Sequence, residues 1–221
     1  MRYIYMLPAA FLAPVIHEMV KAICSAAQGD PTPKNTGRLT LNPFKHFDPI
    51  GFLFILAFGF GWGNPAPTAA LHYKNRQRGV LVTYLVPVLV NLLLGIGAAI
   101  GVAIMAAGIF DPVVAGNHNL FVRFIRYHFL ETDLYVVGML LLSHFAFINI
   151  CLAMFNLIPV FPLAANKILL LFSRPDTIAR VNHYEKPMQI ILILLLAFGI
   201  IAQVFIPIVI QIVRLVWGAV I

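Results

Sequence analysis

Four long apolar runs, separated by shorter polar stretches, set the pattern of hydrophobic and polar positions along this chain. They cover residues 3–28, 79–110, 134–158 and 187–213. Because a helix needs about 20 mostly apolar residues to cross the hydrocarbon core of a bilayer, each run is long enough to span a membrane. The second and third runs contain no Asp, Glu, Lys or Arg, and the fourth is interrupted by Pro207. The pattern predicts an all-α polytopic membrane protein, organised as a single transmembrane domain over residues 1–221.

Two shorter segments do not fit this simple pattern. Residues 49–63 are apolar but broken by Gly and Pro and borderline in length, so we expect a re-entrant segment or a short span. The stretch between the first run and residue 49 is rich in Pro and Gly, and Thr40 alternates there with Leu39 and Leu41. This alternation predicts a small strand or β-hairpin after the first helix.

The composition agrees with a membrane protein, since 61% of the residues are hydrophobic and only 10% are charged, against about 25% charged residues in soluble domains. Basic residues exceed acidic ones in the segments 72–79 and 173–187, whereas acidic residues exceed basic ones in 111–133. We therefore interpret the net charge of +7 as basic loops that anchor the spans, and not as a nucleic-acid surface. The positive-inside rule places 72–79 and 173–187 in the cytoplasm, and we expect a multi-pass protein of a prokaryotic cell membrane, surrounded by lipid.

The first run carries ionisable residues at helical spacing, in the sequence VIHEMVKAI over residues 15–23. In the H-E-x-x-H motif, two histidines one helical turn apart bind zinc, and the glutamate activates the metal-bound water. His17 and Glu18 fit this motif, but Lys21 stands where the second histidine would be. A protonated lysine has no lone pair, so it cannot bind a metal.

The segments that follow resemble the site-2 proteases, a family of intramembrane zinc metalloproteases. GDPTPKNTGRLTLNPFKHFDPIG (29–51) is similar to the family's G-D-x-T-P…G-R-L-T-L-N-P-x-x-H-x-D-P-x-G pattern, and GFGWGNPAP (59–67) resembles the next family element. Asn91 matches the asparagine of a third element, and INICLAMFNLIPVFPLAANKILL (148–170) resembles N-x-x-L-x-x-F-N-L-x-P-x-x-P-L-D-G. The resemblance runs from about residue 10 to 172 in the family's order. It implies a site-2 protease-like helical core.

The departures from the family pattern fall on the implied zinc ligands. The aspartate of L-D-G, the third ligand, is Ala164 here and the second ligand is Lys21, so only His17 remains. Because catalytic zinc needs three protein ligands, we expect no zinc and a vestigial Glu18 without a metal-bound water to activate. Glu18 and Lys21 lie at i and i+3, so we predict an ion pair in which the ammonium takes the place of the metal cation.

Three other interpretations stay open. His46 and His144 could join His17 in a different metal site, which would make the chain an active intramembrane metalloprotease with unrecognised ligands. Ser25, one turn after Lys21, could act with it as a serine–lysine hydrolase. The chain could also be a purely structural subunit of a larger membrane complex.

Asn149, Asn156, Pro159 and Pro162 match the family element that borders a groove for an extended substrate. The asparagines could equally satisfy backbone groups that are freed where a span is broken. If the groove persists, it can bind a segment without cutting it. We therefore expect a catalytically inactive homologue, not an enzyme, that binds another membrane protein or a transmembrane segment as a scaffold or regulatory subunit.

Overall fold

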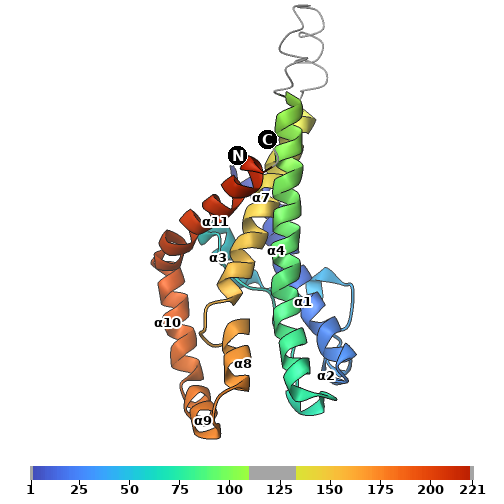
Figure 1. Ribbon diagram of the computed structural model, residues 1–221, viewed down its shortest axis with the longest axis vertical. Helices are drawn as coiled ribbons and strands as arrows, with labels where there is room; N and C mark the ends of the chain where they lie inside the picture. Colours follow the sequence, from blue (N-terminus) through green and yellow to red (C-terminus); the bar gives the residue numbers. More distant parts are fainter. Residues whose placement is uncertain (1, 110–132, 220–221) are drawn as a thin grey trace, which may run out of the picture.

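The computed structural model describes residues 2–109 and 133–219, and within these ranges every regular element is a helix (Figure 1). The loop expected at 111–133 therefore falls almost wholly outside the described residues. The elements are α1 (Arg2–Ala27), α2 (Thr32–Asn35), η1 (Pro43–Lys45), α3 (Pro49–Phe58), η2 (Ala70–His72), α4 (Arg76–Ile109), α7 (Asp133–Asn156), α8 (Ala164–Leu171), α9 (Pro175–His183), α10 (Glu185–Ala197) and α11 (Ile200–Gly218).

Four of the described helices are long and apolar enough to cross a membrane. The qualifying stretches are Ile4–Ala27, Arg76–Ala106, Val136–Asn156 and Ile200–Gly218. The prediction of a polytopic helical membrane protein is therefore confirmed, and the first three stretches lie within a few residues of the predicted spans.

The predicted segment 187–213 differs from the structure, which divides it between two helices. The break lies at Gly199, which has a φ of 70° between α10 and α11. Pro207, where the sequence predicted the interruption, lies inside α11. Glycine adopts a positive φ at little cost, so the backbone turns at Gly199 and the chain continues at a new angle (Figure 1).

The hairpin predicted after the first helix is wrong for the residues that the structure describes, because no strand forms between α1 and α3. The short helix α2 forms there instead and ends in a tight turn at Gly37, in which the Pro33 carbonyl accepts hydrogen bonds from the backbone N–H groups of both Arg38 and Leu39. The side chain of Asn42 then caps η1 by accepting from the Phe44 N–H. These local hydrogen bonds satisfy the backbone without a neighbouring strand.

The apolar segment that follows folds back on itself. With 10 residues, α3 reaches about 15 Å, which is half of the hydrocarbon core. It ends at Gly59, which has a φ of 80°, and an extended segment (residues 59–69) then returns beside it. A Cβ added to Gly51 would lie 2.0 Å from the Trp62 carbonyl oxygen, so the return depends on glycine at this point.

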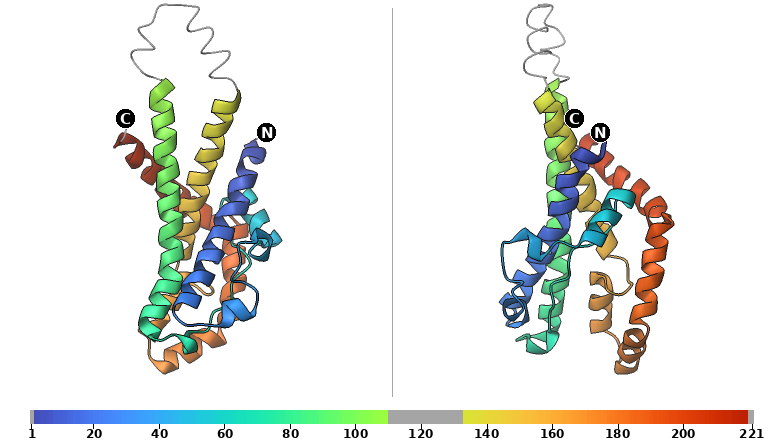
Figure 2. Two further views of the ribbon diagram at one scale, coloured as in Figure 1. Left: turned by 90° about the vertical axis from the view of Figure 1, so that its right-hand side faces the viewer. Right: turned by 180° about the vertical axis from the view of Figure 1, so that it is seen from behind.

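The helices α1, α4 and α7 form the central bundle, and α8, α10 and α11 lie to one side of it (Figure 2). Small residues allow close packing, since Ala10 and Ala13 of α1 are wholly buried and Gly95 of α4 lies against Ile150 of α7. The beginning of α4 and the whole of α9 lie at the same end of the molecule (Figure 1). The two basic loops are therefore at the same end of the molecule.

Candidate functional site

A cavity of about 300 Å³ lies between the central bundle and α10. The helix α1 contributes His17, Glu18 and Lys21, which lie on one face because their spacing matches the helical repeat. The extended segment, α4, α7, α8 and α10 provide the other walls. They are mostly apolar and include Trp62, Tyr84, Phe155, Leu163, Leu192 and Ile193.

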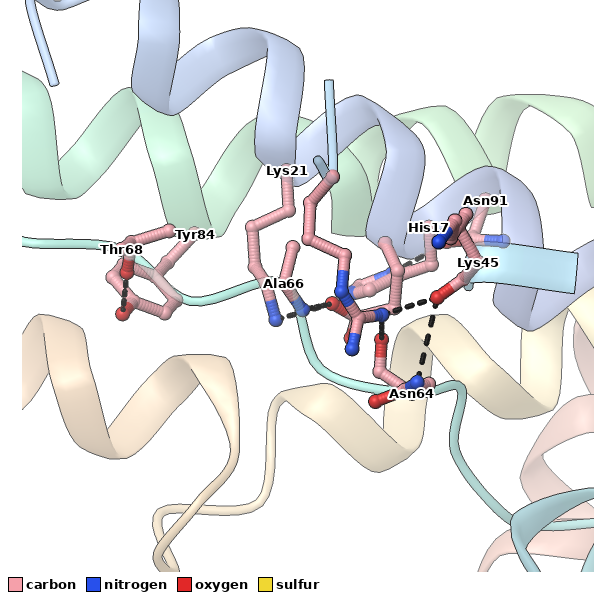
Figure 3. A network of polar contacts seen from close by, with 10 residues as sticks. His17, Lys21, Lys45, Asn64, Ala66, Thr68, Tyr84 and Asn91 are labelled. Carbon is pink, nitrogen blue, oxygen red and sulfur yellow. Dashed lines mark hydrogen bonds and ion pairs between the residues drawn. The ribbon is translucent and has the colours of Figure 1, made fainter. Parts of the chain in front are cut away.

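Glu18 and Lys21 form a buried ion pair inside this cavity. The Lys21 Nζ lies 2.5 Å from the Glu18 Oε2, and the two side chains are 12% and 8% exposed. The same carboxylate oxygen accepts a hydrogen bond from the backbone N–H of Ala66, at 2.8 Å. Figure 3 shows Lys21 extending from α1 toward Ala66 on the extended segment. The charge of Glu18 is therefore balanced by a cation and a backbone dipole.

The extended segment reaches Glu18 because it carries glycine where the backbones approach. A Cβ added to Gly63 would lie 2.9 Å from the Pro14 and His46 carbonyl oxygens and 3.0 Å from Glu18. The position of the segment is held by the Asn64 N–H, which donates to the His46 carbonyl, and by Arg38, whose guanidinium donates to the Lys45 and Asn64 carbonyls. The Ala66 contact could not be found in the sequence because a backbone N–H leaves no side-chain signal.

His17 is held by a chain of hydrogen bonds that crosses three helices. The Phe145 carbonyl can only accept, so Asn149 directs its N–H group to it, at 2.8 Å. The Asn149 oxygen accepts from the Asn91 Nδ2 at 2.8 Å, and the Asn91 oxygen lies 2.7 Å from the His17 Nδ1. Because Asn149 donates to Phe145, its oxygen accepts from the Asn91 amide, and the Asn91 oxygen is left to accept from His17. Neutral His17 therefore carries its proton on Nδ1 and keeps the lone pair on Nε2.

Ala164 lies opposite α1, at the first position of α8. It lines the cavity, is 4% exposed, and packs with Val88 of α4 and Ala153 of α7. Its methyl group offers no donor atom to a metal. The structure thus brings His17, Glu18, Lys21 and Ala164 together around one cavity.

The residues present do not fit the zinc ion that the family resemblance implies. The positions of two ligands are taken by an ammonium group and a methyl group, and Glu18 is already bound to Lys21 and Ala66. Across residues 2–109 and 133–219, no three His, Cys, Asp or Glu side chains are grouped so that they could hold a metal ion. One imidazole does not make a catalytic zinc site.

The alternative arrangements suggested by the sequence are not formed in these parts of the chain. His46 is buried with its Nε2 near the Thr40 carbonyl, and His144 bonds the Leu140 carbonyl on its own helix, so neither joins His17. Ser25 is buried and donates to Asp30 at 2.7 Å, away from Lys21. Its hydroxyl is engaged in a structural contact.

Asp30 joins the end of α1 to the extended segment, a role that its match to the family pattern did not reveal. Its carboxylate accepts from the backbone N–H groups of Thr32 and Ala69 and from the Thr32 and Ser25 hydroxyls. Burial by itself would raise the pKa of Asp30, but these hydrogen bonds outweigh it and lower the pKa to about 2. The carboxylate therefore stays charged at neutral pH.

The four predicted groove residues are separated in the structure. Asn156 and Pro162 line the cavity. Asn149 belongs to the hydrogen-bond chain behind His17, and Pro159 is exposed. The wall formed by Gln189, Leu192 and Ile193 was not predicted, because α10 carries no motif and its position depends on the turn at Gly199.

Comparison with known proteins identifies one relative in Bacillus subtilis (strain 168), named "Putative zinc metalloprotease YwhC". It is 30% identical over 193 residues, which cover 82% of this chain and 74% of that protein. No profile of a known protein family matches the chain, and no solved structure matches it. The identity extends over most of both sequences, and the motifs around His17 and Asn156 resemble those of the site-2 proteases. The chain therefore belongs to the family of YwhC, the site-2 protease-like membrane metalloproteases.

Proposed function

We propose that this chain is a catalytically inactive member of its family, which binds an apolar segment of another membrane protein in the central cavity without cutting it. The observation that carries the proposal is the position of Lys21, whose Nζ lies 2.5 Å from the Glu18 Oε2 inside the cavity. The glutamate that would activate a metal-bound water is neutralised by an ammonium group. On this proposal the protein needs no cofactor and acts as a scaffold or regulatory subunit.

The net charge of the site supports the view that the Lys21 ammonium group replaces the zinc ion. An intact family site holds Zn²⁺ with two carboxylates, which sum to zero. Here Lys21 and Glu18 also sum to zero, and Ala164 removes the second carboxylate. Because an unbalanced charge inside a membrane costs several kcal/mol, the two substitutions belong together. A change at only one of the two positions would leave a net charge.

The cavity itself supports a binding role. It retains about 300 Å³ of space with walls of Trp62, Phe155 and Leu192, which suit apolar side chains. The polar groups of Asn156 and Gln189, which also line the cavity, can form hydrogen bonds with backbone groups of a bound segment. We place the cavity's partner in the prokaryotic cell membrane, with the loops 72–79 and 173–187 in the cytoplasm.

Zinc content per chain tests the proposal. Elemental analysis of the detergent-purified protein should find almost no zinc in the parent and about one zinc per chain in the variant Lys21→His/Ala164→Asp. A size-matched control, Lys21→Gln/Ala164→Leu, lacks both donors and should also be free of zinc. Stoichiometric zinc in the parent would contradict the proposal. A zinc-free double variant would contradict the assignment of these two positions.

Binding can be followed through Trp62, which lines the cavity. In a Trp217→Phe background, Trp62 is the only tryptophan, because the chain has two. Titration with a tryptophan-free peptide of alternating Leu and Ala with terminal lysines, in detergent, should change the fluorescence of Trp62 and reach saturation. Leu192→Arg puts a charge in the cavity wall, so it should weaken the affinity for the peptide at least tenfold. A change that never saturates would contradict a binding cavity.

A further inference from the structure

A second cavity, of about 250 Å³, lies at the other end of the central bundle, between α4, α7 and α11. Its walls include Ala99 and Val102 of α4, Ser143 and Phe147 of α7, and Arg214 and Trp217 of α11. Apart from the Ser143 hydroxyl and the Arg214 guanidinium, these side chains are apolar or, in Trp217, mainly apolar. The cavity is separate from the central one, and neither the family motifs nor the proposed function involves it.

Counted from the basic end of α4, the cavity lies about one bilayer thickness away along the helix. The helix α4 begins with Arg76 and Arg78 and becomes apolar at Val80. From Val80 to Ala99 the helix rises about 28 Å, and the hydrocarbon core is about 30 Å thick. With the start of the hydrocarbon core set at Val80, Ala99 and Val102 lie near the membrane surface that faces away from the basic loops. Trp217 suits this depth, because tryptophan is enriched at membrane interfaces.

Arg214 brings an uncompensated charge to this cavity. Its side chain is exposed, and no residue of the described ranges forms a hydrogen bond or an ion pair with it. The Ser143 hydroxyl likewise has no partner there. A guanidinium group at a membrane surface attracts anionic headgroups, and its paired N–H groups match the oxygens of a phosphate.

We propose that this cavity binds one anionic phospholipid, with its phosphate on Arg214 and one acyl chain among the apolar side chains below. The chain directions order the lining residues by depth. Along α11 the cavity deepens from Trp217 to Ile210, and along α7 from Ser143 to Phe147. The charge is therefore at the headgroup level and the apolar walls are deeper, which is the order of groups in a phospholipid.

The bound lipid contacts α4 and α7, which pack closely on each other, and α11, which meets both of them over a smaller area. The helix α11 packs on α4 and α7 near this cavity and continues from α10, which forms a wall of the central cavity (Figure 2). A lipid between α4, α7 and α11 fills the space at their junction. Because it holds α11 to the bundle, it also supports the position of α10.

Quenching of Trp217 fluorescence by brominated lipid tests the proposal directly. In a Trp62→Phe background, Trp217 is the single tryptophan, and it lies in the cavity wall. The full chain is reconstituted in dioleoylphosphatidylcholine vesicles that contain increasing fractions of phosphatidylglycerol or phosphatidylcholine brominated on the acyl chains. An anionic headgroup near one arginine gains about 1 kcal/mol, so phosphatidylglycerol should occupy the site about fivefold more readily than phosphatidylcholine.

Variants of Arg214 separate this site from ordinary lipid contact. Arg214→Gln should remove the preference for phosphatidylglycerol, whereas Arg214→Lys, which keeps the charge, should retain most of it. Arg78→Gln removes a positive charge at the opposite end of α4 and should leave the preference unchanged. Equal quenching of the parent by both lipids, or a preference that persists in Arg214→Gln, would overturn the proposal.

Discussion

At the residue scale, one ammonium group explains why charged side chains occur in the middle of a membrane helix. Glu18 lies on α1 with a partially buried lysine one turn away and the Ala66 N–H on its other side. Truncation of one partner of a buried ion pair leaves the other charge uncompensated, whereas replacement of both removes the problem. Replacement of Lys21 alone should therefore cost more stability than replacement of Lys21 and Glu18 together, although both changes remove the same ion pair.

We expect Lys21→Met to destabilise the protein by about 3 kcal/mol, because Glu18 would remain buried without a cation. The double variant Lys21→Met/Glu18→Leu should recover most of this loss. Thermal unfolding in detergent measures both, and Lys34→Met, an exposed lysine outside the bundle, is the control. A Lys21→Met variant as stable as the parent would show that the ion pair does not balance the site.

At the element scale, the bundle depends on how closely α4 approaches α7. A Cβ added to Gly95 would lie 2.6 Å from the Ile150 side chain and 3.0 Å from the Ala146 carbonyl oxygen. Gly97, two residues later on the same helix, has no atom within 4 Å of such a Cβ. The same contact brings Asn91 and Asn149 together, so the hydrogen-bond chain behind His17 relies on it.

Gly95→Ala should therefore destabilise the protein by about 1–3 kcal/mol, because the added methyl group forces the helices apart. Gly97→Ala should be neutral or stabilise by up to about 1 kcal/mol, since it gains helix propensity without a clash. The apparent melting temperatures of the two variants in the same detergent make the comparison. Equal effects would contradict the close approach of α4 and α7 at Gly95.

At the scale of the whole molecule, the fold places the two basic loops at the same end. Loop 72–79 and the helix α9 lie at one end, and the end of α11 lies toward the other (Figure 1). The fold shows that the two basic loops are together, and the positive-inside rule adds the expectation that this end is cytoplasmic.

Single cysteines test this orientation, in a background where Cys24 and Cys151 are replaced by alanine. We expect a membrane-impermeant maleimide to label Gly218→Cys in intact cells, but to label Gln77→Cys and Asp176→Cys only after permeabilisation. All three positions are exposed in the structure. The reverse pattern would contradict the cytoplasmic assignment. Opposite labelling of Gln77→Cys and Asp176→Cys would contradict the fold.

The sequence by itself determined three of the membrane-spanning segments closely, because the length of an apolar run has to match the bilayer. It also determined that two implied ligand positions hold no metal donor, since the ammonium group of Lys21 and the methyl group of Ala164 offer no lone pair in any conformation of the chain. The tertiary structure alone decided the partners of these residues. The Ala66 N–H, the chain from Phe145 to His17 and the wall of α10 depend on contacts between distant segments. Backbone groups and turns such as Gly199 carry no periodic signal, so only packing could place them.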